Sequence, residues 1–107
     1  MEGYGEFLWK DGNKYCGYYV ADKKEGFGVF YWPSSSKIFV GFWKNEKQEG
    51  IGKKITHSRV KYSLFKSGKI VHDYESVGDA LNELEKEQKC FLHFFDLELE
   101  EIIEFFN

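Results

Sequence analysis

Aromatic and β-branched residues alternate with polar ones through the first two thirds of the chain, and short turn-forming segments interrupt the alternation. Residues 27–32 and 37–44 have the composition that strands prefer. The Pro-Ser-Ser-Ser segment 33–36 between them has turn chemistry, and residues 10–13 contain an Asp-Gly pair typical of a hairpin. We therefore predict successive β-hairpins, joined by polar connectors at residues 21–25 and 45–49.

Two glycine signatures recur along this pattern with a common period. Gly-x-Gly pairs are spaced by 23 and 24 residues, at Gly3 and Gly5, Gly26 and Gly28, and Gly50 and Gly52. An aromatic-x-Gly-x-aromatic motif recurs after 24 residues, first as Tyr15, Gly17 and Tyr19 and then as Phe39, Gly41 and Trp43. Residues 61–65 form a weaker copy with Ser63 in the glycine place. A fixed period in two independent motifs indicates a repeated supersecondary unit.

The glycines have a packing explanation. Side chains two residues apart on a strand share a face, so Phe39, Gly41 and Trp43 point the same way. Glycine weakens a strand unless another group must approach closely. We expect large rings from adjacent strands to lie across the glycine positions, which gives a curved sheet with one aromatic-lined face.

The last third of the chain has a helical pattern. Ser76 or Asp79 is a plausible N-cap. An apolar face follows at Val77, Ala80, Leu81 and Leu84. A second and stronger apolar stripe, opposite an acidic one, is formed by Phe91, Phe95, Leu99, Ile102, Ile103 and Phe106. The tail is expected to form two helices or one bent helix.

So large an apolar face requires a partner, because each large apolar side chain gains about 1.5–3 kcal/mol on burial. Three arrangements satisfy this requirement: the tail packs on its own sheet, it mediates a homodimer, or it binds another protein. A short repeat array also needs a cap over its exposed face. Packing of the tail on the sheet is therefore the preferred arrangement.

The repeat resembles the MORN (membrane occupation and recognition nexus) repeat over roughly residues 3–70. The matching positions are Tyr15, Gly17, Tyr19, Gly26 and Gly28 in one unit and Phe39, Gly41, Trp43, Gly50 and Gly52 in the next. The resemblance implies a mainly β fold, an open antiparallel sheet of successive hairpins, with the helical tail packing on it. It also implies a scaffold or binding platform in cytoskeletal, ciliary or membrane-associated assemblies, and a chain that is a fragment of a larger repeat protein.

Charge divides the chain in the same way as the patterning. Residues 1–72 hold thirteen basic and seven acidic residues, a net +6, whereas residues 73–107 hold two and eleven, a net −9. The expected units are a hairpin-repeat region, residues 1–75, and an acidic helical tail, residues 76–107.

The sequence contains no apolar run long enough to span a membrane and no leader pattern, so the expected compartment is the cytoplasm. Cys16 and Cys90 are expected to be free thiols there.

The sequence offers no local signature of a catalytic, metal or cofactor site. His57, His72 and His93 stand apart, and neither cysteine has a neighbouring histidine. The Gly3–Leu8 segment lacks the third glycine of a dinucleotide fingerprint. The rings occur at repeat-core positions, which argues against nucleic-acid stacking. We expect a protein without enzymatic activity, cofactor, metal or nucleic-acid partner.

Three functions remain open. The first is a protein-interaction scaffold that holds a helix in a groove lined by Trp9, Tyr15, Tyr19, Trp32, Phe39 and Trp43. The second is a module that binds anionic phospholipid through basic residues: Lys10, Lys14, Lys23, Lys24, Lys37, Lys44, Lys47, Lys53, Lys54 and Arg59. The third is a regulatory appendage of an enzyme outside this chain. The first is preferred.

Overall fold

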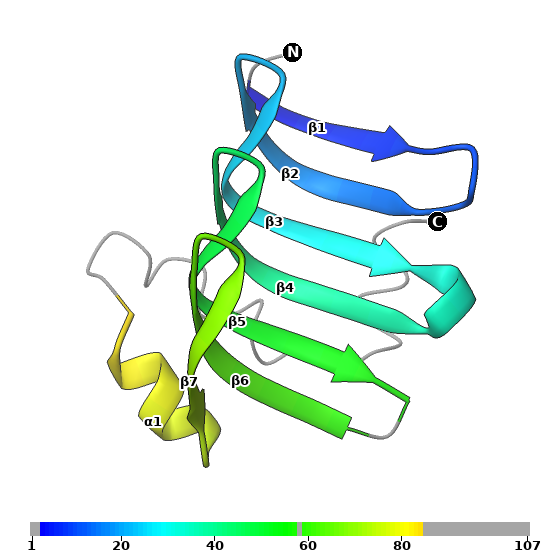
Figure 1. The fold of residues 1–107 in the computed structure, drawn as a ribbon. Coiled ribbons are helices and arrows are strands. Elements are labelled where there is room, and N and C mark those ends of the chain that lie inside the picture. Colours follow the sequence, from blue (N-terminus) through cyan, green and yellow to red (C-terminus); the bar gives the residue numbers. More distant parts are fainter. Residues whose placement is uncertain (1–2, 58, 85–107) are drawn as a thin grey trace.

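A single antiparallel sheet of seven strands forms the body of the protein (Figure 1). The computed structural model describes residues 3–57 and 59–84. Each strand pairs with the next one along the chain. The elements are β1 (Gly3–Leu8), β2 (Lys14–Val20), β3 (Lys23–Trp32), the 3₁₀ turn η1 (Pro33–Ser35), β4 (Lys37–Lys44), β5 (Lys47–Thr56), β6 (Arg59–Lys66), β7 (Lys69–Tyr74) and α1 (Val77–Asn82). The predicted open sheet of successive hairpins, with a helical segment after it, is confirmed.

Three tight turns lie one above another along one side of the sheet (Figure 1). They are centred on residues 21–22, 45–46 and 67–68, and all six residues have positive φ. Two-residue turns of this kind match the right-handed twist of the strands that they join. The connectors predicted at 21–25 and 45–49 are thus wrong in extent. Only two residues turn in each, because β3 and β5 already begin at Lys23 and Lys47.

The turns on the opposite side are longer and follow the predicted turn chemistry. After β1, the Trp9 amide donates to the Asn13 carbonyl oxygen at 2.9 Å, and Gly12 has φ +94°. After β3, the 3₁₀ turn begins at Pro33 and ends on Ser36 in the left-handed region. The turns expected at 10–13 and 33–36 are confirmed.

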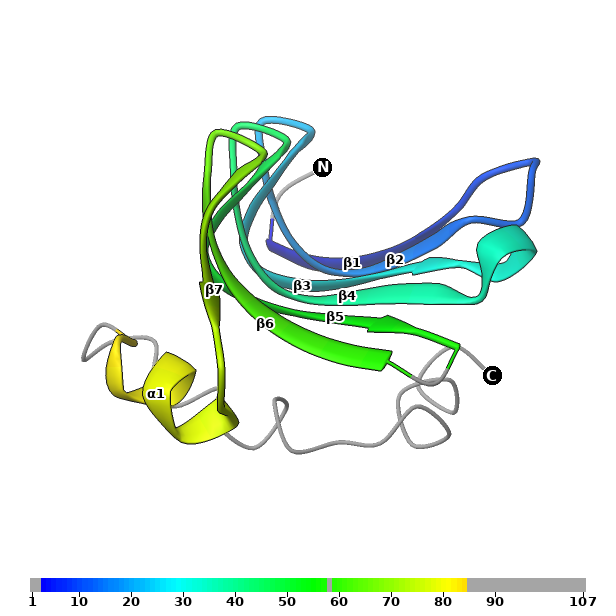
Figure 2. The same cartoon turned by 60° about the horizontal axis from the view of Figure 1, so that its bottom comes forward.

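The sheet bends sharply at a line of β-bulges, and this bend raises the three tight turns above the rest of the sheet (Figure 2). Between the Gly17–Gly28 and Tyr19–Lys24 pairs, β3 has two more residues than β2. The same irregularity recurs between β4 and β5. Gly26 and Gly50 lie in these insertions with φ of +87° and +86°. Bulges bend a strand and increase its twist, and glycine adopts the required φ without strain.

The helix α1 lies on the convex side of the bent sheet (Figure 2). The Ser76 side-chain oxygen caps it by accepting from the Asp79 amide at 3.1 Å, which confirms Ser76 as the N-cap. Its residue Ala80, together with Leu84 just after it, belongs to an apolar core with Val29, Ile38 and Val40. This core therefore occupies the convex face, and the second core, which is aromatic, occupies the concave face.

The tail prediction is confirmed only as far as Leu84. Ala80 and Leu84 are 0% and 5% exposed, so this part of the predicted apolar face is buried against the sheet. The stronger stripe lies outside the described residues: Phe91, Phe95, Leu99, Ile102, Ile103 and Phe106.

Candidate protein-binding face

A row of glycines crosses the concave face of the sheet at right angles to the strands. The pairing places Gly5 opposite Gly17, Gly17 opposite Gly28, Gly28 opposite Gly41, and Gly41 opposite Gly52. A Cβ atom at Gly28 would overlap the Tyr15 ring, and one at Gly52 would overlap the Phe39 ring. The expected close approach of rings to glycines is therefore confirmed at these positions.

The two glycines of each Gly-x-Gly pair have different roles. Gly28 and Gly52 make room for a ring from the preceding strand. Gly26 instead has its nearest neighbouring atom, Tyr18 Cβ, at 3.7 Å from an added Cβ, and its φ is positive. The expectation that both glycines of a pair lie beneath rings is thus wrong, because the first one provides the backbone conformation of the bulge.

The rings over this row form one packed cluster, which we call the concave ring cluster. It consists of Tyr15, Tyr19, Phe30, Phe39, Trp43 and Phe65, with Trp9 and Trp32 packed against it. Tyr15 meets Tyr19 and Trp43 edge to face at centroid distances of 5.1 and 5.8 Å. Phe39 does the same with Trp43 and Phe65 at 5.3 and 5.2 Å. Edge-to-face rings contribute about 0.5–1.5 kcal/mol beyond their buried area.

All six predicted groove residues belong to this cluster, but they are not equally accessible. Four of them are 0–6% exposed and pack against one another: Tyr15, Tyr19, Phe39 and Trp43. Trp9 and Trp32 are half-buried. The surface that a partner can reach is therefore formed by the two tryptophans, while the other four residues hold the face together.

These observations coincide with a known repeat. The family model of the MORN repeat matches residues 1–14 and 15–37. The chain contains MORN repeats. The hairpin β4–β5 lies beyond the matched residues, yet it repeats the glycine pairing, bulge and ring placement of the MORN hairpin β2–β3. Comparison with curated proteins found no match.

A row of stacked rings lies where β1 and β3 end, and some of these rings are partly exposed. Trp9 stacks on Phe30 at 5.3 Å, and Phe30 stacks on Trp32 at 4.2 Å. Phe7, which is 43% exposed, extends the row from β1, with its ring centroid 4.6 Å from that of Trp9. The Lys37 ammonium lies 4.5 Å from the Trp32 ring centroid at the other end. We use the name ring row for the four rings and the lysine together: Phe7, Trp9, Phe30, Trp32 and Lys37. Sequence reasoning missed Phe7 and Phe30.

A buried lysine lies among the aromatic side chains of the concave ring cluster. The Lys24 ammonium is 5.4–5.6 Å from the ring centroids of Trp9, Tyr15, Phe30 and Trp43. Lys24 is only 8% exposed, and its ammonium pairs with a Glu46 carboxylate oxygen at 2.9 Å. Burial alone would raise the pKa of Glu46, but the hydrogen bonds and the charge of Lys24 lower it below its ordinary value.

Two tyrosine hydroxyls lie at the centre of the concave face. The Tyr15 hydroxyl donates to the Tyr18 carbonyl oxygen at 3.2 Å, and burial raises its pKa. Burial, with the nearby Glu46 charge, also raises the pKa of Tyr19. Among the described residues no group hydrogen-bonds the buried Tyr19 hydroxyl. An unsatisfied buried hydroxyl normally costs about 1–3 kcal/mol.

Glutamates link successive hairpins at their tips. A Glu25 carboxylate oxygen accepts from the Asn45 amide at 3.1 Å, and a Glu49 oxygen accepts from the Ser67 amide at 3.0 Å. The Lys24 carbonyl oxygen likewise accepts from the Glu46 amide at 3.1 Å. Sequence reasoning missed these links, although a glutamate directly precedes both Gly26 and Gly50 at the repeat spacing.

Exposed lysines flank the same tips and form what we call the basic rim: Lys23, Lys44, Lys47, Lys66 and Lys69. A cavity of about 390 Å³ between the second and third tips is lined by three of these lysines, together with Asn45, Glu49 and Ser67. Lys24 and Lys53, which the sequence grouped with the lipid-facing residues, are 8% and 5% exposed. They have too little exposed surface to meet a lipid headgroup.

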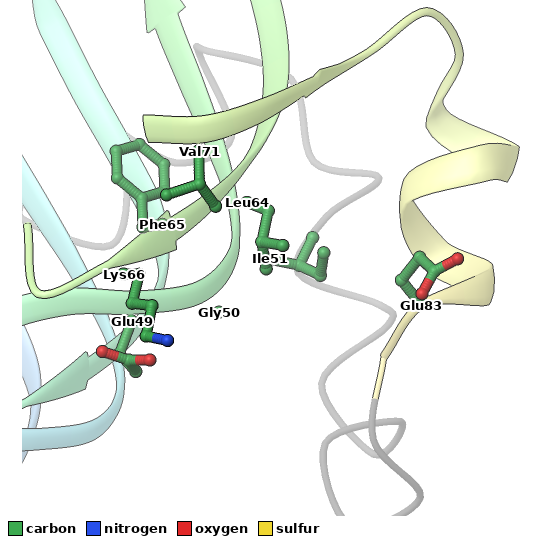
Figure 3. Close-up of a pocket in the computed structure, with 8 residues that line it drawn as sticks. All are labelled: Glu49, Gly50, Ile51, Leu64, Phe65, Lys66, Val71 and Glu83. Carbon is green, nitrogen blue, oxygen red and sulfur yellow. The ribbon is translucent and has the colours of Figure 1, made fainter. Parts of the chain in front are cut away.

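A second cavity, of about 370 Å³, opens beside α1 on the convex side (Figure 3). Ile51, Leu64 and Val71 form its apolar lining, and Glu49, Lys66 and Glu83 add charge. Figure 3 shows Glu83, at the C-terminal end of α1, across the cavity from Glu49 and Lys66 on the strands.

The described residues contain no cluster of three or more metal-binding side chains. No helix within residues 3–57 and 59–84 is long and apolar enough to cross a membrane. Cys16 is a buried free thiol, and burial is the main cause that raises its pKa, which makes it a poor nucleophile. Its sulfur lies within hydrogen-bond reach of the Tyr4 hydroxyl.

Proposed function

We propose that the protein is a non-enzymatic interaction module that binds a protein partner on its concave face. MORN repeats are generally protein- or membrane-interaction modules. The observation that carries the proposal is the ring row, in which Phe7, Trp9 and Trp32 keep exposed surface while the buried rings beneath hold them in place. Tryptophans supported in this way are typical of the residues that contribute most to protein interfaces.

The proposed occupant is an amphipathic helix, because a bent sheet with an apolar floor fits an apolar stripe of i, i+3 and i+4 side chains. The Lys37 ammonium supplies a hydrogen-bond donor for an acceptor of that partner. We place this interaction in the cytoplasm, at a cytoskeletal or ciliary assembly.

A paired comparison tests the proposal. Trp9→Ala with Trp32→Ala removes the accessible rings, whereas Val60→Ala changes a 52% exposed residue of the convex face. Both variants are checked for folding by circular dichroism and are used to capture proteins from a lysate. We expect proteins retained by the wild type and by Val60→Ala to be lost with the tryptophan variant. Equal retention by all three proteins would refute this face as the binding site.

The basic rim favours a second candidate function, peripheral binding to anionic phospholipid. Its five exposed lysines lie along one side of the sheet, and each basic residue near an anionic surface gains about 1 kcal/mol. Sedimentation with phosphatidylserine vesicles at low and high salt tests this function. Binding that weakens with salt and is lost in Lys44→Glu with Lys47→Glu would support it. Absence of binding at low salt would exclude it.

A further inference from the structure

The three Gly-x-Gly strands of the sheet are close structural copies of one another. Gly3, Gly26 and Gly50 have φ values of +82°, +87° and +86°. β1 reads Gly-Tyr-Gly-Glu-Phe-Leu, and the corresponding part of β3 reads Gly-Phe-Gly-Val-Phe-Tyr. Each of these strands pairs with the strand after it so that its second glycine lies opposite Gly17, Gly41 or Ser63. β1 therefore has the backbone conformation and the sequence of an internal strand.

β1 differs from its copies in what lies on its other side. β3 and β5 each receive a ring from the preceding strand, Tyr15 over Gly28 and Phe39 over Gly52. Among the described residues, β1 pairs with β2 alone. Gly5 is accordingly only half-buried, whereas Gly28 and Gly52 are buried.

The apolar side chains of β1 are exposed where those of β3 are covered. Tyr4 is 60% exposed and Phe7 is 43% exposed, while their counterparts Phe27 and Phe30 are 6% and 8% exposed. Leu8, the last residue of the strand, is 66% exposed. A long apolar edge with unpaired backbone groups is a template for another strand.

The opposite end of the sheet has polar groups at the same repeat positions, beside Ile70 and Val71 of β7, which are 46% and 55% exposed. Lys61, Ser63 and Asp73 stand where Phe39, Gly41 and Gly52 stand one hairpin earlier. The Asp73 carboxylate accepts from the Ser63 hydroxyl at 2.7 Å and pairs with the Lys61 ammonium at 3.1 Å. The last described hairpin thus has an ion pair in place of the ring on glycine, whereas β1 keeps the ring-and-glycine pattern.

We propose that the edge of β1 that no described strand covers binds an extended strand with the aromatic-x-Gly-x-aromatic pattern, supplied by a MORN-type repeat of another chain. The incoming strand takes the register that β2 uses on β3. Its glycine lies opposite Gly5, and its first ring lies across Gly5 as Tyr15 lies across Gly28. Backbone hydrogen bonds provide affinity, and the ring on glycine provides register. This surface shares Phe7 with the ring row but does not include Trp32.

A peptide copy of β2 provides the probe. It comprises residues 13–20 with serine in place of Cys16, and it is titrated onto the full chain while amide chemical shifts are followed by NMR. We expect saturable binding with shifts concentrated in Gly3–Leu8. The peptide carrying Tyr15→Ala should bind at least tenfold more weakly, and Gly17→Val, which adds a branched Cβ at the glycine row, should abolish binding.

The protein variants separate this edge from the concave face. Trp32→Ala should bind the peptide as the wild type does, even if it loses every partner of the concave face. Gly5→Val, checked for folding by its amide spectrum, should lose the peptide. Shifts outside β1, equal binding of the Tyr15→Ala peptide, or no binding at millimolar peptide would each overturn the proposal.

Discussion

The Tyr15 ring lies across Gly28 of the neighbouring strand, where the Cβ of any other residue would stand. Phe39 and Gly52 repeat this relationship one hairpin further along the chain. Each ring is thereby fixed against the backbone of the partner strand in its own hairpin. The contact between side chain and glycine joins the two strands of a hairpin and supports the ring row.

Gly28→Ala should destabilise the protein by about 1–3 kcal/mol, because the added methyl group cannot fit beneath the Tyr15 ring. Gly78→Ala is the matched control. It lies in α1 with its nearest neighbouring atom 3.8 Å from an added Cβ, and it should stabilise by about 0.5–1 kcal/mol. Urea denaturation measures both changes. Equal effects of the two substitutions would contradict the steric role of Gly28.

Lys24→Met should destabilise the protein by about 1–2 kcal/mol, because the cation over four rings and its pairing with Glu46 are both lost. Methionine keeps most of the buried volume, so a cavity does not explain the loss. Thermal unfolding of the two proteins at pH 7 measures the difference. An unchanged stability would show that the cation contributes nothing.

Glu46 makes part of the stability pH-dependent. Its folded-state pKa lies below the ordinary value of about 4.5, so the folded state holds the carboxylate charged more readily than the unfolded state does. This contribution is present above pH 4.5 and is lost as the pH falls through the folded pKa. Glu46→Gln should therefore be less stable than the wild type at pH 7, with a smaller difference at pH 3. A difference that stays constant between the two pH values would argue against this linkage.

Glu25→Ala should destabilise the protein by about 0.5–1.5 kcal/mol, since the Asn45 amide loses its carboxylate acceptor. Glu25→Gln keeps an oxygen at that position and should retain most of the stability. Hydrogen exchange at the Asn45 amide gives the local readout. It should be faster in the alanine variant than in the glutamine variant, and equal rates would refute the link between hairpin tips.

Cys16 should react with a thiol reagent at least tenfold more slowly in the folded protein than in denaturant, because burial raises its pKa and hinders access. The Cys90→Ser background isolates this thiol. Tyr4→Ala should accelerate the reaction by uncovering the sulfur. Equal rates in the folded and the denatured protein would place Cys16 on the surface.

The hairpins and the ring-on-glycine contact could be predicted from the sequence because both depend on local, periodic signals. The period-2 pattern assigns each ring to a face, and a glycine at a fixed offset marks where a ring approaches the backbone. The family match supports the same assignment over residues 1–37. Ser76 was also predictable, since capping depends on neighbouring residues alone.

The accessible surface could not be predicted, because it depends on the bend of the sheet. The bulges at Gly26 and Gly50 raise the hairpin tips, and four of the six expected groove rings are buried as a result. The same bend brings Lys24 from a tip into the rings, although its sequence neighbours suggest a solvated lysine. The sequence did not predict that β3 begins at Lys23 and β5 at Lys47. The residues there are polar and resemble a connector, but they pair as strands within the raised tips.

Proton NMR of the glycine row tests most directly whether rings stacked on glycines join the two strands of each hairpin. We predict upfield ring-current shifts of the Hα protons of Gly28 and Gly52, with nuclear Overhauser contacts to the rings of Tyr15 and Phe39 respectively. Tyr15→Leu should return the Gly28 resonances toward ordinary strand values and leave those of Gly52 in place. Ordinary Hα shifts at both glycines in the wild type, without contacts to either ring, would contradict the account.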